Sequence, residues 1–261
     1  METRAIRVPI AWLEIPVLVE LFHLLVTPVP LRLRRLGYLR ESVLLLSRGR
    51  RCHAAWAPHL AASRAAILDA CEGLDQTRIA VVLGSGLLQD VPIADLARRF
   101  REVHLVDAVH LWPARRLVRT YSNVRLITAD LNAEPGRVDP LPALCGGAEV
   151  DFVVSANLLS QLPILPLDRP GLLPPDLGGR IVRAHLEGLG RLRARVCLLT
   201  DIEQFEEDRT GRITDRIDLL HGVRLDPPDR DWIWEIAPFG EAARHHRLRH
   251  RVQAFLNWRT A

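Results

Sequence analysis

Residues 79 to 100 constrain the fold of this chain most strongly. Ile79 to Leu83 is a short apolar run rich in β-branched residues, which is typical of a strand buried on both faces. The run stops at Gly84-Ser85-Gly86, where two residues without Cβ atoms allow a sharp turn and let a ligand approach the backbone. From Asp90 to Phe100 apolar residues recur near a 3.6 period, so we expect a helix after the turn.

A second strand and an acid complete this unit. Val103 to Val106 is again apolar, and Asp107 stands at its carboxyl end. A helix N-terminus offers unpaired N–H groups, and a carboxylate about 20 residues beyond a glycine turn can bind ribose hydroxyls. The interval from Gly84 to Asp107 therefore predicts a site for an adenosine-containing cofactor. The alternative is an ordinary βαβ unit with a tight loop.

Composition excludes several classes of chemistry. With 261 residues and 48% hydrophobic content, the chain can bury one large core or two smaller ones. A net charge of +4 is too weak to indicate nucleic-acid binding. All 35 basic residues are arginine, so the chain has neither a P-loop lysine nor a Schiff-base lysine for pyridoxal phosphate.

The cysteines and the apolar N-terminal segment indicate the cellular compartment of the protein. Cys52, Cys71, Cys145 and Cys197 are scattered and form no CxxC pair, which favours buried thiols in a reducing cytosol over disulfides or a zinc site. No signal-peptide pattern is visible. The apolar segment from Ile10 to Val29 carries charges and a proline, so we expect it to pack on the protein rather than span a membrane. These features predict a cytoplasmic protein without a transmembrane segment.

The remaining pattern predicts an α/β protein with a Rossmann-like, doubly wound sheet. We expect three further parallel strands, a loop over 163–179 and a helix over Gly178 to Leu192; the strands are Val124 to Thr128, Val150 to Ser155 and Arg195 to Thr200. Trp232 to Ile236 and Arg247 to Leu256 are joined by a short connection, which predicts a terminal antiparallel β-hairpin.

An α-helical extension is expected before the sheet. Helices are predicted over Trp12 to Leu25, Leu31 to Leu46 and Trp56 to Cys71. We therefore divide the chain into a helical N-terminal extension or lid, residues 1–75, and a Rossmann-like domain, residues 76–261.

Residues 78 to 258 resemble a class I S-adenosylmethionine-dependent methyltransferase. Leu83-Gly84-Ser85-Gly86 is similar to the family's glycine loop, and Asp107 matches the acid that ends its second strand. Thr128 to Leu131 resembles the motif after the third strand, and Asp151 to Leu162 resembles the fourth-strand motif. The terminal hairpin matches the family's antiparallel last strand.

The resemblance implies S-adenosyl-L-methionine as cofactor and gives roles to particular residues. Asp107 would hold the ribose, and Asp130 would meet the adenine amine. Each acid also has a plain structural alternative, a helix cap or turn for Asp107 and a turn for Asp130, and Asn157 suits a helix cap as well as the cofactor cleft. The implied cofactor-binding set is Gly84, Ser85, Gly86, Asp107, Ala108, Asp130, Leu131 and Asn157.

Two positions depart from the family pattern. Val82 stands where an acid usually helps to hold the methionine amino group, and Leu88 replaces the third glycine. Either the methionine end is held differently, by Asp90 or a polar group near Asn157, or cofactor binding is impaired.

Other polar residues are weaker candidates for binding the cofactor or a metal. His110 and Trp112 either flank the adenine or form helix-start contacts. His245, His246 and His250 are interleaved with arginines, which favours a solvated basic strand over a metal site, so no metal is predicted.

The acidic segment after the fifth predicted strand is the last candidate. It either binds a cationic substrate or forms a solvated face, and the second reading is favoured; its members are Glu203, Glu206, Glu207 and Asp208.

Methyl transfer to a small-molecule or other acceptor is therefore the leading functional hypothesis. A base near Asp201, Glu203 or His110 would deprotonate a hydroxyl or amine acceptor, and the choice among them stays open. A non-catalytic binding module of the same fold is the first alternative. An NAD-dependent oxidoreductase is the second, although its fingerprint requires glycine or alanine where Gln89 stands. The acceptor and the oligomeric state do not follow from the residues.

Overall fold

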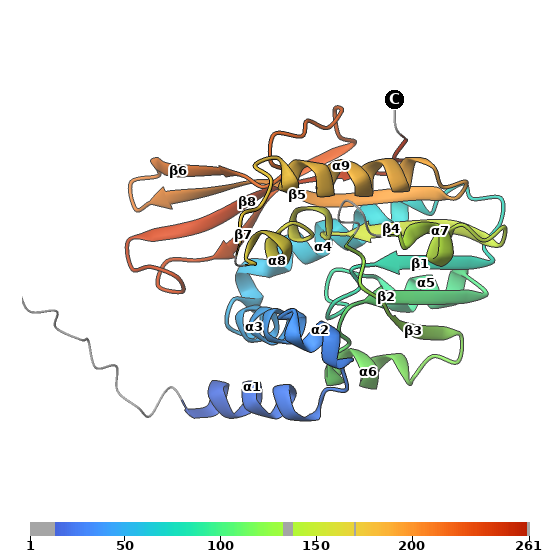
Figure 1. The fold of residues 1–261 in the computed structure, drawn as a ribbon, viewed down its shortest axis with the longest axis horizontal. Helices are drawn as coiled ribbons and strands as arrows, with labels where there is room; N and C mark the ends of the chain where they lie inside the picture. Colours follow the sequence, from blue (N-terminus) through green and yellow to red (C-terminus); the bar gives the residue numbers. More distant parts are fainter. Residues whose placement is uncertain (1–13, 133–137, 170, 260–261) are drawn as a thin grey trace, which may run out of the picture.

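A computed structural model describes residues 14–132, 138–169 and 171–259 of the chain. Its centre is one eight-stranded sheet with the strand order β3-β2-β1-β4-β5-β8-β7, and β6 pairs with β5 outside this path (Figure 1). The strands are β1 (Ile79–Leu83), β2 (Glu102–Asp107), β3 (Val124–Thr128), β4 (Val150–Ala156), β5 (Arg195–Asp208), β6 (Ile213–Asp218), β7 (Arg230–Ala237) and β8 (His246–Phe255). Strands β3, β2, β1, β4 and β5 are parallel, whereas β6, β7 and β8 pair antiparallel, which confirms the predicted fold class.

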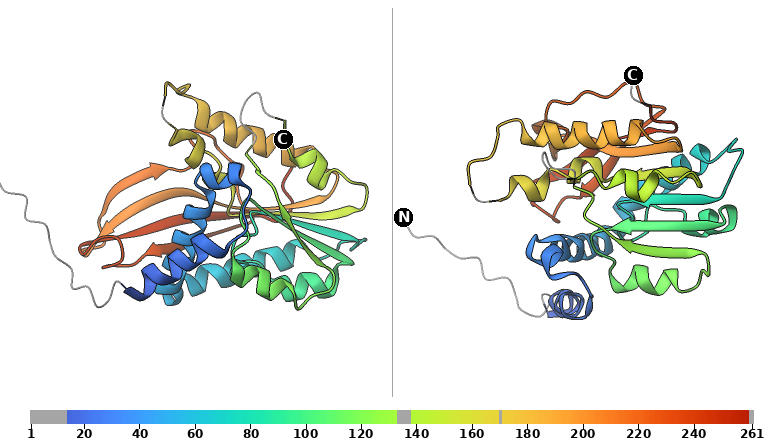
Figure 2. Two further views of the ribbon diagram at one scale, coloured as in Figure 1. Left: turned by 60° about the horizontal axis from the view of Figure 1, so that its bottom comes forward. Right: turned by 45° about the vertical axis from the view of Figure 1, so that its right-hand side comes forward.

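Helices cover both faces of this sheet (Figure 2). They are α1 (Glu14–Val26), α2 (Leu31–Arg35), α3 (Tyr38–Arg51), α4 (His53–Ala70), α5 (Ile93–Arg99), α6 (Trp112–Val118), α7 (Leu141–Cys145), α8 (Ile164–Leu167) and α9 (Leu177–Gly190), with a 3₁₀ turn η2 (Leu159–Gln161). No helix within the described ranges is long and apolar enough to cross a membrane.

Strand β1 shows why the sheet needs two helical layers. Val82 packs into a core shared with α4, α5 and α6. Val81 and Leu83 pack into the opposite core, which α7 and α9 complete. Because successive side chains of a strand point to opposite faces, an all-apolar strand is stable only when both faces are covered.

Two predicted helices have different bounds in the structure. The helix predicted over Leu31 to Leu46 is divided into α2 and α3, because Gly37 between them adopts a φ of +95°. The helix predicted from Asp90 begins only at Ile93, since the turn that follows β1 continues through Leu88 at a φ of +60°.

The fifth strand is much longer than predicted. Sequence patterning ends it at Thr200, but β5 continues to Asp208 and pairs with β8 from Leu198 onward. The acids that were expected to be a solvated face lie within this strand. Glu207 is buried because Arg247 and Arg249 on β8 bind its carboxylate at 2.6 and 2.5 Å. Cross-strand arginines thus allow an acidic sequence to continue a sheet.

Two connecting segments also contain unpredicted structure. Residues 213 to 218, for which the sequence analysis predicted no strand, form the edge strand β6 beside the distal half of β5. The proline-rich segment over 163–179, predicted as one loop, contains α8 and the start of α9.

Among the N-terminal helices, α4 packs on the sheet, whereas α3 packs on the segment that follows β2. Leu39, Val43 and Leu46 of α3 share a core cluster with Val109 and Leu111, which follow β2. On α4, Trp56 packs in a second cluster with Trp234 of β7 and donates its indole N–H to the carbonyl of Ile236 at 3.0 Å. The division into an extension over 1–75 and a domain over 76–261 stays a prediction.

Replacement of Trp56 should show how strongly α4 is attached to the sheet. Trp56 is 3% exposed, so Trp56→Ala leaves a large cavity and an unpaired carbonyl. We expect a loss of about 3–5 kcal/mol in the free energy of unfolding, measured by urea denaturation. Trp112→Ala is the matched control, because Trp112 is 44% exposed. Equal losses in the two variants would show that α4 is not held by this contact.

Candidate functional site

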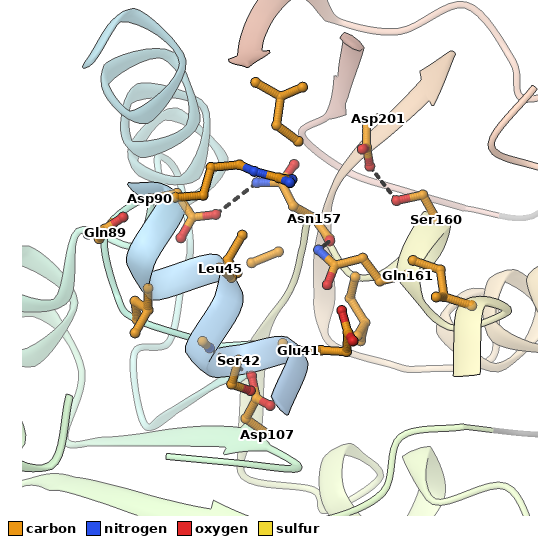
Figure 3. A pocket seen from close by; sticks show the side chains of 18 of the residues that line it. Glu41, Ser42, Leu45, Gln89, Asp90, Asp107, Asn157, Ser160, Gln161 and Asp201 are labelled. Atoms are coloured by element: carbon orange, nitrogen blue, oxygen red, sulfur yellow. Dashed lines mark hydrogen bonds between the residues drawn. The ribbon is translucent and has the colours of Figure 1, made fainter. Parts of the chain in front are cut away.

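A cavity of about 460 Å³ opens at the carboxyl ends of the parallel strands. Its lining comes from α3 and α4, the turn after β1, the ends of β2 and β4, η2 and α8, and the strands β5, β7 and β8. Glu41, Ser42 and Leu45 of α3 lie across the opening from the sheet (Figure 3). This position at the strand ends is where α/β sheets bind ligands.

The glycine turn forms one wall of the cavity, as predicted. Gly84 and Gly86 line it and have φ values of +71° and +48°. A Cβ on Gly84 would lie 2.9 Å from Cβ of Leu158 and 3.1 Å from the carbonyl oxygen of Ala156, so a side chain would not fit there. The helix α5 begins at Ile93, beyond the lining residues, so the backbone of the turn and not the helix N-terminus faces the cavity.

Asp107 is fixed at the end of β2 by the same turn. Its Oδ2 accepts the backbone N–H of Gly86 at 2.7 Å, and its Oδ1 accepts that of Val109 at 3.2 Å. Burial raises the pKa of Asp107, and the hydrogen bond from Gly86 opposes this shift. The carboxylate lines the cavity beside the turn (Figure 3), together with the adjacent Ala108.

Asp90 and Asn157 form a second polar pair in the cavity (Figure 3). Asn157 Nδ2 donates to Asp90 Oδ2 at 2.8 Å, while the buried Asn157 Oδ1 has no hydrogen-bond partner in the described part of the chain. Burial raises the pKa of Asp90, and the bond from Asn157 acts against that rise. A half-buried carboxylate beside an unused amide oxygen favours a cationic ligand.

The placement of Asn157 differs from the predicted one. A helix cap is one of its two predicted roles, but Asn157 has a φ of +47° and precedes Leu158, the residue that caps the 3₁₀ turn η2. Gln161, at the end of η2, donates its side-chain amide to the carbonyl of Asn157 at 2.6 Å. This contact holds the strained residue in place.

The other predicted cofactor residues are divided between the cavity and its surroundings. Leu131 lines the cavity, but Asp130 is not among the lining residues. Asp130 Oδ1 accepts the hydroxyl of Tyr38 at 2.8 Å, and Arg32 lies 3.8 Å from Oδ2. Ser85, within the glycine turn, is buried and does not line the cavity.

Both departures from the family pattern lie in the core. The side chains of Val82 and Leu88 pack into the cluster shared with α4 and α5, and neither lines the cavity. The bulky Leu88 therefore does not obstruct the cavity.

Two candidates for the base are placed elsewhere. His110 is buried with Nε2 3.0 Å from the carbonyl oxygen of Ile127, and burial lowers its pKa. Glu203 binds Arg216 at 2.7 Å. Neither residue lines the cavity, and neither does Trp112, whose ring lies 5.3 Å from the Arg116 guanidinium carbon.

The third candidate, Asp201, joins a polar cluster at the far end of the cavity. Its Oδ2 lies 2.6 Å from His250 Nδ1, and the Ser160 hydroxyl donates to its Oδ1. Gln204 Oε1 lies 3.0 Å from His250 Nε2. Burial raises the pKa of Asp201, but the contacts with His250 and Ser160 outweigh it and hold the pKa below its usual value.

The antiparallel strands explain how these groups meet. His250 on β8 pairs directly with Gln204 on β5 and with Trp234 on β7. A register shift between Asp201 and Glu203 places an extra residue in β5, which brings Asp201 and Gln204 to the same side. The prediction of a solvated strand is therefore wrong for His250, which is buried.

His59 of α4 completes this end of the cavity. Its ring stacks on Trp234 with centroids 4.1 Å apart and an interplanar angle of 8°. Trp232 donates its indole N–H to His59 Nδ1 at 3.1 Å. Sequence patterning did not single out His59, because its helix shows no motif and the contact depends on strands about 170 residues away.

Metal binding has no support in the described ranges. No group of three or more histidine, cysteine, aspartate or glutamate side chains there could hold an ion. His246 and His250 belong to a strand whose buried histidine is instead paired with Asp201.

No protein-family model and no curated protein matches this sequence. Among solved structures, the chain is similar to 1,6-didemethyltoxoflavin-N1-methyltransferase of Burkholderia thailandensis with bound S-adenosylhomocysteine, at 17% identity over 83% of this chain and 90% of that chain, with a TM-score of 0.39. It is similar to the N-methyltransferase NodS of Bradyrhizobium japonicum, also with S-adenosylhomocysteine, at 12% identity over 73% and 84%, with a TM-score of 0.35. A Leishmania major S-adenosylmethionine-dependent methyltransferase aligns at 14% identity over 90% and 81%, with a TM-score of 0.37. Because these sequence identities and TM-scores are low, the assignment of a function rests on the cavity.

The buried His59 should make stability depend on pH. Burial lowers its pKa from 6.5 to about 4, so between these values the unfolded chain binds a proton that the folded chain does not. Stability should therefore fall as the pH drops from about 6.5 towards 4, and this residue should account for about 2 kcal/mol between pH 7 and 5.

Urea denaturation at several pH values measures this effect. His59→Gln should flatten the loss between pH 7 and 5, whereas His53→Gln, at an exposed position of the same helix, should leave it unchanged. The interpretation fails if both variants keep the wild-type pH profile.

Proposed function

We propose that this protein binds S-adenosylmethionine in the cavity and transfers its methyl group to a small-molecule acceptor. The observation that carries the proposal is the pairing of Asp107 with the open glycine turn. The carboxylate lies at the carboxyl end of β2 and is held by the N–H of Gly86, with both groups lining one cavity. This arrangement suits a ribose, because the hydroxyls of the sugar can donate to a fixed carboxylate.

The adenine would lie beside Ala108 and Leu131. Both side chains are apolar and line the cavity next to Asp107, so they offer a surface for a flat base. Asp130 would accept from the adenine amine if its contact with the Tyr38 hydroxyl rearranged on binding.

The methionine end would be held without the family's usual acid. Asp90 and Asn157 Oδ1 present oxygen atoms that suit an ammonium group. Arg48 of α3 lines the same cavity, forms no ion pair in the described part of the chain, and has a buried Nε without a partner. Its guanidinium would bind the cofactor carboxylate.

The helices before the sheet would act as a lid. Residues of α3 cover the cavity opposite Asp107 and Asn157 (Figure 3). Enclosure favours methyl transfer, because the positive sulfonium already makes the methyl carbon electrophilic and the protein mainly has to align donor and acceptor. This role supports treating residues 1–75 as a functional unit.

Two other proposals fit the cavity less well. An NAD-dependent oxidoreductase would need space beside the turn at Gln89, whose side chain lines the cavity. A binding module without catalysis would not require the polar cluster at Asp201. The free, buried thiols of all four cysteines favour a reducing compartment, so we propose a cytoplasmic location.

Isothermal titration separates these functions. Wild-type protein should bind S-adenosylmethionine and S-adenosylhomocysteine but not NAD. Asp107→Ala should weaken both of the first two ligands by about 10- to 100-fold, because hydrogen bonds to a charged group are lost. Asp95→Ala, at a partly exposed site on α5, is the control and should leave affinity unchanged. Full affinity in Asp107→Ala would remove the ribose assignment.

The methionine subsite can be tested apart from the adenosine subsite. Asp90→Asn removes the negative charge proposed to hold the ammonium group. It should weaken S-adenosylhomocysteine by about tenfold or more, while 5′-methylthioadenosine, which lacks the amino-acid end, should bind as to wild type. Equal weakening of both ligands would show that Asp90 supports the turn and does not contact the ammonium group.

A further inference from the structure

The far end of the cavity contains polar groups that the cofactor proposal does not use. Asp201, His250 and Gln204 lie on the antiparallel strands, and His59 lies opposite on α4. The indole N–H of Trp234 is buried without a hydrogen-bond partner in the described ranges. Buried polar groups are almost always paired, so an unpaired donor in a cavity wall suggests that a ligand supplies the missing acceptor.

We infer that this end of the cavity is the methyl-acceptor site and that it takes a single-ring phenol, whose hydroxyl proton passes to His250. The inference rests on the proposed methyl transfer and adds to it the acceptor class and the group that receives the proton. The polar cluster together with Trp56, Leu60, Trp234 and Ile236 is called the acceptor pocket below.

His59 acts in this pocket as a donor and not as a base. An indole N–H can only donate, so the bond from Trp232 requires His59 Nδ1 to be unprotonated. A neutral ring with an unprotonated Nδ1 carries its proton on Nε2, for which the described residues provide no partner. Stacking on Trp234 fixes the plane of the ring. His59 and Trp234 therefore offer two uncharged N–H donors to a ligand oxygen.

His250 is the group best placed to accept a proton. The ionised Asp201 holds His250 through Nδ1, so Nε2 is the nitrogen left for exchange. Gln204 occupies Nε2 in the structure, and its amide can present either oxygen or NH₂ by rotating. A phenol hydroxyl would take the place of this amide, and Asp201 would stabilise the imidazolium that forms.

The transfer step balances without a further reactant. The phenol O–H bond breaks and its proton binds Nε2 of His250. An electron pair of the phenol oxygen forms the new bond to the methyl carbon, and the pair of the breaking C–S bond stays on sulfur. The sulfonium becomes a neutral thioether, and the acceptor becomes an aryl methyl ether.

The lining favours an uncharged ring over other acceptors. Trp56, Leu60, Trp234 and Ile236 give the pocket an apolar, largely aromatic wall. The Asp201 carboxylate disfavours an anionic ligand. Since the cavity of about 460 Å³ must also hold the cofactor, its size favours a small ring.

Binding is tested with 4-methylphenol on protein saturated with S-adenosylhomocysteine, using isothermal titration. We expect wild type to bind 4-methylphenol at least about tenfold more tightly than 4-methylbenzoate. Trp234→Phe, which keeps an aromatic ring but removes the N–H, should weaken 4-methylphenol several-fold and leave S-adenosylhomocysteine affinity unchanged.

The binding experiment distinguishes an error in the phenol assignment from a failure of the proposed methyl transfer. Absence of 4-methylphenol binding, unchanged affinity in Trp234→Phe, or tighter binding of 4-methylbenzoate through Arg48 would overturn the phenol assignment. If S-adenosylhomocysteine itself does not bind, the methyl-transfer proposal fails instead.

The role of His250 is tested by turnover of S-adenosylmethionine with 4-methylphenol, with 4-methylanisole detected by mass spectrometry. Wild type should form the ether, and His250→Asn should slow its formation by about 10²- to 10⁴-fold while S-adenosylhomocysteine affinity stays the same. His246→Asn on the same strand, outside the cavity lining, is the control and should retain the wild-type rate. Binding without ether formation in wild type, or equal rates in His250→Asn and wild type, would overturn the assignment of His250 as the proton acceptor.

Discussion

The pairing of β5 with β8 is the interaction on which the rest of this structure depends. The first half of β5 lies between β4 and β8 inside the sheet, and its second half continues beyond the end of β4 between β6 and β8. The single strand β5 therefore joins the parallel part of the sheet to its antiparallel part (Figure 1). The proposed cofactor residues lie at the carboxyl ends of the parallel strands, and the acceptor pocket lies at the antiparallel strands. Because β5 belongs to both parts of the sheet, it fixes the distance between the two sites.

Three carboxyl groups that line the cavity share one property, which is that partial or full removal from water destabilises their charged form. Asp201 is buried and Asp90 and Asp107 are half-buried, and the loss of water around each carboxyl group by itself raises its pKa. A different partner at each site offsets the unfavourable desolvation of the carboxylate. The partners are backbone N–H groups at Asp107, an amide at Asp90 and a histidine at Asp201. These differences match the proposed roles, because a sugar hydroxyl, an ammonium group and a transferred proton require different partners.

Much of the candidate site could be predicted from sequence where it depends on local order. Gly84, Gly86, Asp107, Ala108, Leu131 and Asn157 were all predicted and line the cavity. They follow directly from strand ends, so their place at one edge of a parallel sheet is a consequence of topology. Asp130 is one residue from Leu131, yet it does not line the cavity and instead accepts the hydroxyl of the lining residue Tyr38, since side-chain direction depends on neighbours that the local sequence does not reveal.

Periodicity and turn residues act over short distances, so the five parallel strands, the glycine turn, the acid after β2 and the terminal hairpin could be predicted from local sequence. The continuation of β5 through an acidic segment could not, since the arginines that neutralise Glu207 lie on another strand. The same holds for the acceptor pocket. His59, Asp201 and His250 come together through the packing of α4, a shift of register in β5 and cross-strand pairing, and each of these joins residues that are far apart in the chain.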